Sequence, residues 1–422
     1  MHASLQDVFR EHFAQFERGR SLHPRERRAA WCISHCRQPE MGGHLLSCPQ
    51  GHYATFVGHA CGHRSCPRCA SGPRQLWLAQ QLPKLLPCPH FHAVFTLPHV
   101  FIALWQFNRT LLTQMLFDSA RASLLELCAD ARHLGAIPGL LMALHTWGRT
   151  LSHHPHIHCL VSAGGADAQG QWRACKSSFL VPVEPLRQLF RGKLLSAISQ
   201  ALNHQRLALP PQQPAPHWRT AISQQWRAHW NIQLNPAYPH GRGVALYLAR
   251  YVKGGPLGSD RRLHLSDDAV AFAYFDHRDA KRKNLTLPVA EFIARILWHA
   301  PPKGQHCTRQ AGLYATALTR QHRDALKSLC PAPPPAKLNT LAAHQPQPPA
   351  PKLTSCPTCQ APLQRRYVRP ESHQSGEFSK PRPPRPSHLG PTGRCNGLLT
   401  GGPAPPPINR RPSGAACQKP LN

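Results

Sequence analysis

The sequence predicts a fold of the α/β class, with a small zinc-binding module before it and a Pro-rich tail after it. Between residues 85 and 300, β-prone apolar runs alternate with amphipathic helical stretches. Cys and His residues cluster before residue 70, and the composition becomes Pro-rich after Cys330. The predicted domains are residues 1–75 (zinc-binding), 85–320 (the α/β domain) and 330–422 (a Pro/Arg-rich tail without stable structure).

The composition indicates a polyanionic partner. The 422 residues include 50 Lys and Arg against 19 Asp and Glu, a formal net charge of +31, which is more than solubility requires. Nucleic acid is favoured over a membrane, because no apolar run approaches the ~20 residues of a spanning helix and the start lacks a signal-peptide pattern. We expect a cytoplasmic protein whose 16 Cys are metal ligands and buried thiols rather than disulfides.

The α/β domain is predicted from the period of its apolar residues. A period of two, with β-branched and aromatic residues, indicates strands, and a period near 3.6 indicates helices. The predicted strands are Phe91 to Pro98, Leu140 to Trp147, His156 to Ala163 and Ala269 to Phe275. The predicted helices are Val100 to Ala131, Glu184 to Ala201, Ala245 to Val252 and Pro288 to His299.

The first candidate site is a Cys/His cluster between residues 36 and 69. Cys66-Pro-Arg-Cys69 has the spacing with which two thiolates hold one tetrahedral zinc, and Cys48 with His52 is the expected partner pair. Four protein ligands close the coordination sphere, so this zinc would be structural. Four surplus side chains could form a second site, replace one of these ligands, or be simple buried thiols and surface imidazoles: Cys36, His44, Cys61 and His63.

The second candidate site is the pair His156 and His158. The β-prone run from Ile157 ends at Gly164-Gly165, which indicates a strand closing into a turn. Alternation along a strand places both imidazoles on one face, where they could bind a divalent cation and leave positions for a phosphate oxygen. The alternative is an exposed histidine run, because the chain has 29 His, and we interpret the similar pair His90/His92 as a chance occurrence.

The third candidate site is the pair Tyr247 and Tyr251 in GRGVALYLARYVKGG. Their spacing places both phenols on one face of a predicted helix bounded by glycines. A pair of core tyrosines is the alternative, but Arg250, Lys253 and Gly254-Gly255 crowd the same segment and suit a DNA backbone. A phenol with a pKa of ~10 is a poor nucleophile, so a metal or neighbouring cations must assist it.

The order of several motifs resembles the transposases of the insertion sequence ninety-one family. Between about residues 25 and 320 the zinc module is followed by FHAVFTLP, LHTWGRTLSHHPHIHCLVSAGG, FLVPVEPLRQLFRGKLL, YLARYVKGGP, FAYFDHRD, LTLPVAEFIARILWH, PPKG and GLYA. The resemblance implies a zinc-binding domain followed by an HUH endonuclease domain, which has a central antiparallel sheet flanked by helices.

The resemblance also implies an activity. A transposase of this type nicks and rejoins single-stranded DNA in rolling-circle transposition, as a site-specific endonuclease and strand transferase. His156 and His158 would bind a catalytic Mg²⁺ or Mn²⁺, and Tyr251 and Tyr247 would attack DNA to leave a 5′-phosphotyrosine and a free 3′-OH. The expected partner is single-stranded DNA at the transposon ends and target, without a membrane and without a nucleotide cofactor, since the sequence has no G-x-x-x-x-G-K-[ST] run.

The sequence leaves several alternatives open. A plasmid replication initiator or a mobilisation relaxase would share the chemistry, and a non-catalytic zinc-finger regulator would explain the charge and the cysteines alone. Many relatives have a C-x-x-C pair where this chain has Cys48 and His52, and the knuckle Cys356-Pro-Thr-Cys359 in the tail has no convincing partner pair. The third ligand of the catalytic metal is either His154 or a polar side chain from elsewhere.

Overall fold

The computed structural model describes residues 2–175, 180–238, 254–258, 262–276, 279–315, 320–330 and 353–370, with the single positions 241, 243, 245, 246, 248 and 249. Tyr247 and Tyr251, the two predicted nucleophiles, lie outside the described residues, as do residues 331–352 and 371–422 of the predicted tail.

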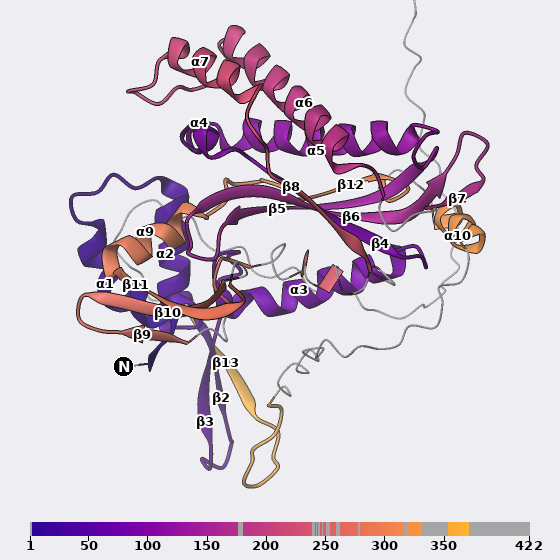
Figure 1. Cartoon of the computed structure of the whole chain (residues 1–422). Coiled ribbons are helices and arrows are strands. Elements are labelled where there is room, and N and C mark those ends of the chain that lie inside the picture. The colour runs from indigo at the N-terminus through magenta and orange to yellow at the C-terminus, as the bar shows by residue number, and fades with distance from the viewer. Residues whose placement is uncertain are drawn as a thin grey trace, which may run out of the picture. The chain divides into compact units, whose positions relative to one another are not determined.

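The largest sheet has six antiparallel strands (Figure 1). Its order is β12-β5-β6-β4-β8, and β7 also pairs with β6. Strands β5 and β6 are long and central, and they contain two of the predicted strands. The central antiparallel sheet flanked by helices is therefore confirmed. The strands are β4 His90–Thr96, β5 Ile137–Trp147, β6 His153–Ala166, β7 Trp172–Ala174, β8 Ile232–Tyr238 and β12 Thr308–Gly312.

One face of this sheet is apolar and covered by helices. Phe91, Phe95 and Ile157 belong to this face and are almost fully buried against the helices. Each such side chain removed from water stabilises the fold by roughly 1.5 to 3 kcal/mol. Figure 1 shows helices lying over this face. They are α4 Ile102–Phe107, α5 Arg109–Ala129, α6 Val183–Asn203 and α7 Ala215–Gln225, with a 3₁₀ turn η3 at His99–Phe101.

The predicted single helix from Val100 to Ala131 is interrupted at Asn108. The backbone of Asn108 leaves the helical region, with φ −127° and ψ 40°. Its amide nitrogen donates to the carbonyls of Leu104 and Ala208, at 2.9 and 2.7 Å, and its amide oxygen accepts from the Ala208 N–H at 2.8 Å. An Asn side chain that bonds backbone groups in this way competes with the helix, which explains the break.

The opposite face of the sheet carries both apolar and polar side chains. Leu141, Ala143 and Leu160 pack there with Trp77 of α3 and with the predicted tyrosine helix, of which Leu248 and Ala249 are buried. The described positions 243, 245, 246, 248 and 249 of that segment are helical. The helix α3, Pro67–Gln81, ends in a 3₁₀ turn η2 at Leu82–Lys84 and lies under this face in Figure 1.

A second sheet, of order β1-β9-β10-β11, packs with α1, α2 and α9. The predicted strand Ala269 to Phe275 is β10, but it belongs to this sheet and not to the central one. Phe9 and Ile33 share a core with Phe292 and Ile296, so the N-terminal helices pack on residues late in the sequence. The elements are β1 His2–Ala3, α1 Leu5–Glu17, α2 Pro24–His35, β9 Leu263–Leu265, β10 Ala269–Asp276, β11 Lys281–Pro288 and α9 Val289–Trp298.

The third sheet joins the N-terminal hairpin to part of the tail. Strand β13, Gln364–Val368, pairs antiparallel with β2, and β2 pairs with β3. The prediction of a tail without stable structure is therefore wrong for residues 353–370, because main-chain hydrogen bonds to β2 order this segment. The remaining elements are η1 Pro39–Met41, β2 Gly43–Ser47, β3 Ala54–Gly58 and α10 Arg320–Leu329. Among the described residues no helix is both long and apolar enough to cross a membrane.

Candidate metal centres

Three histidines converge on the face of the central sheet that is turned away from α5 and α6. His156 and His158 come from β6, and His145 comes from β5, directly opposite His156. One ring nitrogen of each lies within 4.8 Å of the others. The ring centroids are 4.7 Å apart for His156 and His158 and 3.9 Å apart for His145 and His158. The alternation predicted for β6 is confirmed, because Ile157 between the two histidines is buried in the opposite layer.

Burial keeps these three imidazoles neutral. It lowers the pKa of His156 to about 3 and holds the pKa values of His145 and His158 well below their usual value. A metal binds the lone pair of a neutral imidazole, so proton competition at neutral pH is small. The site can therefore accept a divalent cation without first losing protons.

The third histidine of the group is His145, a side chain from elsewhere in the sequence, and not His154, the other candidate. The His154 ring is exposed and outside the group, and its contribution is its carbonyl oxygen, which accepts a hydrogen bond from His156 Nδ1 at 2.5 Å. That bond fixes the proton on Nδ1 and leaves Nε2 free for a metal, the arrangement common to metal-binding histidines. Sequence reasoning missed His145, although it follows Leu141 and Ala143 at a period of two on the same face.

A fourth histidine, His92 of β4, contacts this group from the neighbouring strand. Its Nε2 lies 2.7 Å from His158 Nδ1, and its Nδ1 lies 3.2 Å from the side-chain amide of Asn235 on β8. The interpretation of the His90/His92 pair as a chance occurrence is therefore wrong for His92. His90 has another role, because its Nδ1–H donates to the Cys88 carbonyl at 2.8 Å and its Nε2 accepts from the Tyr314 hydroxyl at 2.5 Å.

Described residues next to the predicted nucleophiles pack on the same face of the sheet. Leu248 and Ala249 are buried with Leu160, which lies two residues beyond His158 on β6. At one end, a Cβ added to Gly241 would come within 2.9 Å of the His90 ring. At the other end, a Cβ added to Gly255 would come within 3.0 Å of the Ser65 carbonyl oxygen. Glycines are needed at both ends because the segment approaches its neighbours so closely.

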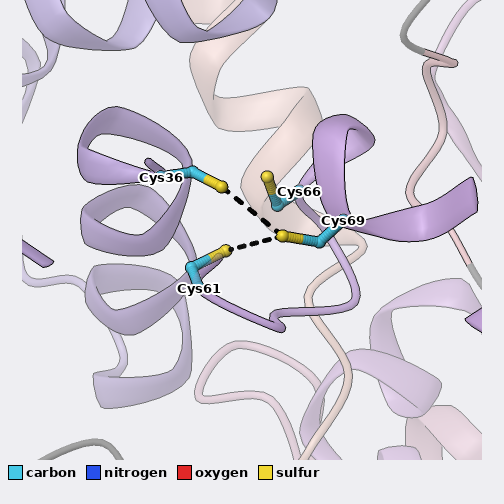
Figure 2. A group of neighbouring side chains, drawn as sticks. All are labelled: Cys36, Cys61, Cys66 and Cys69. Atoms are coloured by element: carbon cyan, nitrogen blue, oxygen red, sulfur yellow. Dashed lines mark hydrogen bonds between the residues drawn. The ribbon is translucent and has the colours of Figure 1, made fainter. Parts of the chain in front are cut away.

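Four thiols converge where α2 ends and α3 begins (Figure 2). Cys36 follows α2, Cys61 lies in the loop, and Cys66-Pro-Arg-Cys69 forms the start of α3. Cys69 Sγ lies 3.4 Å from Cys36 Sγ and 3.6 Å from Cys61 Sγ, and the four sulfurs lie within 4.8 Å of one another. Two sulfurs of a tetrahedral zinc site are roughly 3.8 Å apart, since each Zn–S bond is ~2.3 Å. The group thus suits one zinc ion with a closed coordination sphere.

The predicted zinc set is divided by this geometry. Cys66 and Cys69 join Cys36 and Cys61, whereas Cys48 and His52 lie in another group. The prediction of Cys48, His52, Cys66 and Cys69 as one set is wrong, because the hairpin β2–β3 carries Cys48 and His52 away to the third sheet. His63, one of the surplus candidates, instead accepts a hydrogen bond from the Ser65 N–H at 3.1 Å.

Comparison with known proteins adds the decisive observation. Residues 8–97 match a transposase zinc-binding domain, and residues 139–322 match a putative transposase domain. The chain is 35% identical over 338 residues to a putative transposase, y4qJ, of Sinorhizobium fredii, a match that covers 78% of this chain and 85% of the relative. It is 34% identical over 304 residues to the transposase for insertion sequence element IS801 of Pseudomonas savastanoi pv. phaseolicola, covering 68% and 70%. The chain belongs to the insertion sequence ninety-one family of transposases.

This transposase is therefore a DNA-processing enzyme that binds DNA and carries a zinc-binding domain with a cysteine cluster suited to structural zinc. No solved structure matches the chain. The matched transposase domain includes the three histidines and both Tyr247 and Tyr251, whereas His92 lies before it. The histidine group on β5 and β6 therefore lies inside the matched transposase domain.

Proposed function

We propose that this transposase cleaves and rejoins single-stranded DNA with a tyrosine nucleophile beside a divalent metal bound to His145, His156 and His158. The observation that carries the proposal is the convergence of three buried, neutral imidazoles on one face of the sheet. Buried histidines that served only the core would not need one ring nitrogen of each within 4.8 Å of the others. Such a group is typical of a metal site that leaves further positions for substrate.

The chemical type of the three proposed ligands favours some divalent metals over others. It contains three imidazoles and no carboxylate, and imidazole is a poor ligand for Mg²⁺, which prefers oxygen. We therefore expect Mn²⁺ to be bound more tightly than Mg²⁺. When bound, the ion polarises a non-bridging oxygen of the scissile phosphate.

The proposed nucleophile is a tyrosine adjacent in sequence to residues packed on this face. Tyr247 and Tyr251 are neighbours in sequence of Leu248 and Ala249, which pack beside Leu160 on the histidine-bearing strand. The phenolate oxygen of Tyr251 attacks phosphorus in line, the bond from phosphorus to the 3′ oxygen breaks, and that oxygen takes up a proton to become a free 3′-OH. The 5′ end stays linked to the tyrosine, so the energy of the broken bond is kept for the joining step.

The two tyrosines have different roles in this proposal. Residues four apart on a helix have Cβ atoms about 6 Å apart, so only one phenol can be in line with a phosphate at a fixed position. In the sequence, Tyr251 precedes Lys253 and Gly254-Gly255, where DNA can approach, whereas Tyr247 is flanked by Leu246 and Leu248. We assign the first attack to Tyr251 and a second transfer to Tyr247.

Cys36, Cys61, Cys66 and Cys69 would bind one structural zinc in this enzyme. The ion would join the end of α2 to the start of α3. The adjacent Ser65 carbonyl faces Gly255 at the end of the tyrosine segment, so the zinc would also fix one border of the candidate active site. Its role is positioning, because four protein ligands leave no open coordination position.

A cleavage assay tests the proposal. The full chain is incubated with a 5′-labelled single strand carrying a transposon end, in Mn²⁺ or in EDTA, and the products are resolved under denaturing conditions. We expect a labelled fragment with a 3′-OH in Mn²⁺ only, and no cleavage by His145→Ala or His156→Ala. Cleavage of the duplex in preference to the single strand, or cleavage in EDTA, would contradict the proposal, and DNA binding without cleavage would favour a non-catalytic regulator.

A further inference from the structure

A second group of metal-ligand side chains lies in the third sheet, away from the site described above. Cys48 and His52 belong to the turn between β2 and β3, and Cys356 and Cys359 belong to the turn that precedes β13. One ligand atom from each of the four lies within 4.8 Å of all the others. Two turns that are 311 residues apart, measured from Cys48 to Cys359, therefore meet at one point.

The distances in this group suit a tetrahedral ion. Cys48 Sγ lies 3.5 Å from Cys359 Sγ and 4.0 Å from His52 Nδ1. A tetrahedral zinc with Zn–S bonds of ~2.3 Å keeps its sulfurs roughly 3.8 Å apart. A disulfide would need about 2.05 Å, and Cys48, Cys356 and Cys359 are all free thiols. Three thiols and one imidazole are one of the common ligand sets of structural zinc.

Backbone hydrogen bonds in each turn hold the metal-ligand side chains in place. The Gly51 N–H donates to the Cys48 carbonyl at 3.0 Å, and Gly51 has a φ of +79°, which a glycine adopts without strain. In the second turn the Cys356 N–H donates to the Ala361 carbonyl at 2.8 Å, and the Thr358 N–H donates to Cys356 Sγ at 3.4 Å. An N–H group aimed at sulfur favours the thiolate, which is the form that binds metal.

The third sheet has short strands with few buried side chains, although the rings of His44, His59 and Tyr367 lie against one another. Each of its three strands has five residues, and in these strands only Gly43 is buried. Tyr367 in β13 is 54% exposed, whereas Cys48 and Cys356 are 5% and 0% exposed. Such short strands without an apolar core are marginal in water, and small modules of this kind usually need a metal or disulfides.

We propose that Cys48, His52, Cys356 and Cys359 bind a second zinc ion, which fastens residues 353–370 to the N-terminal hairpin. The matched transposase domain ends at residue 322, so half of this site lies beyond both matched domains. The chain then carries two zinc ions, one in each cysteine group. The second ion holds β13, with the exposed Arg365 and Arg366, against β2.

The test measures zinc content and strand protection in the full chain. Zinc per chain is determined by plasma mass spectrometry for the wild type and for Cys356→Ser with Cys359→Ser. Amide hydrogen exchange is followed in residues 43–47 and 364–368. We expect the wild type to carry about two zinc ions and the double variant about one. The amides of β2 and β13 should lose protection in the variant while those of α3 keep theirs.

Three further variants sharpen the test. His52→Cys supplies a fourth thiolate and should keep both zinc ions, whereas His52→Ala should lose the second one. Cys175→Ser removes a thiol that belongs to neither group and should change nothing. About one zinc in the wild type, or an unchanged zinc content in the Cys356/Cys359 variant, would overturn the proposal. Loss of that zinc with full protection of the β13 amides would overturn the fastening role.

Discussion

His92 Nε2 lies 2.7 Å from His158 Nδ1, on two neighbouring strands of the central sheet. This contact determines which nitrogen His158 can offer to a metal. If His158 Nδ1–H donates to His92, Nε2 of His158 carries no proton and keeps its lone pair, and His92 Nδ1–H must then donate in turn. The Asn235 side chain stands 3.2 Å from that atom, and a half-turn of its amide would supply the oxygen acceptor.

The first prediction follows from this chain of contacts. Replacement of His92 with Ala should lower the apparent Mn²⁺ affinity about 10- to 100-fold, the usual cost of removing a residue that orients a metal ligand. Asn235→Asp, which can only accept, should keep the affinity, whereas Asn235→Leu should lower it. Cleavage is titrated with Mn²⁺ for each variant, and the rate at saturating Mn²⁺ should stay near the wild type. His154→Ala is the control, because the exposed ring can be lost while the carbonyl remains.

The second prediction concerns the metal ligands themselves. His145→Ala, His156→Ala and His158→Ala should each reduce cleavage to background, because each removes one imidazole of the group. The affinity for single-stranded DNA and its dependence on salt should stay almost unchanged, since binding depends mainly on Lys and Arg contacts to phosphates. Affinity is measured by fluorescence anisotropy at several salt concentrations. A His145 variant that still cleaves would show that the third ligand lies elsewhere.

The third prediction distinguishes the two cysteine groups. Cys66→Ser with Cys69→Ser should release about one zinc per chain and destabilise the junction between the end of α2 and the start of α3, because structural zinc contributes folding energy directly. The second zinc should stay bound, since Cys48 and His52 belong to the other group. Zinc is counted by mass spectrometry and stability by thermal unfolding. Release of both zinc ions would indicate one shared set after all.

The fourth prediction concerns acid stability and rests on His299. Burial lowers its pKa to about 4, its Nε2–H donates to the Leu151 carbonyl, and its Nδ1 accepts from the Thr146 hydroxyl. Between this pKa and ~6.5, its value in the unfolded chain, the unfolded state binds more protons, so stability falls as the pH falls. One such group lowers the free energy of unfolding by about 1.4 kcal/mol between pH 7.5 and pH 5.5.

His299→Gln tests this contribution. Glutamine offers both a donor and an acceptor at the same place but does not titrate. The free energy of unfolding is measured with denaturant at pH 7.5 and pH 5.5. Its change between the two pH values should be about 1.4 kcal/mol smaller in the variant. An equal pH dependence in both proteins would mean that His299 is not held neutral by burial.

The candidate active site was only partly predictable from the sequence. His156 and His158 could be placed on one face because strand alternation is a local property. His145 and His92 reach the site through strand pairing, and pairing partners distant in sequence cannot be read from periodicity.

The zinc sites show the same limit. Short spacing identified Cys66 and Cys69 as a pair, but spacing cannot decide which other pair completes a site. Cys48 and His52 take their partners from Cys356 and Cys359, in a region whose composition alone indicates no structure. Similarly, Ala269 to Phe275 was predictable as a strand but not as a member of the second sheet, because sheet membership depends on tertiary packing.

The most direct test of the central claim is to map the covalent adduct. Wild type, Tyr251→Phe, Tyr247→Phe and the double variant are incubated with single-stranded transposon-end DNA and Mn²⁺. After nuclease and protease digestion, peptide mass spectrometry locates any phosphotyrosine-linked nucleotide. We predict an adduct on Tyr251 in the wild type and in Tyr247→Phe, and none in Tyr251→Phe or in the double variant. An adduct only on Tyr247 would reverse the assigned order, and one that persists in the double variant would contradict the tyrosine mechanism.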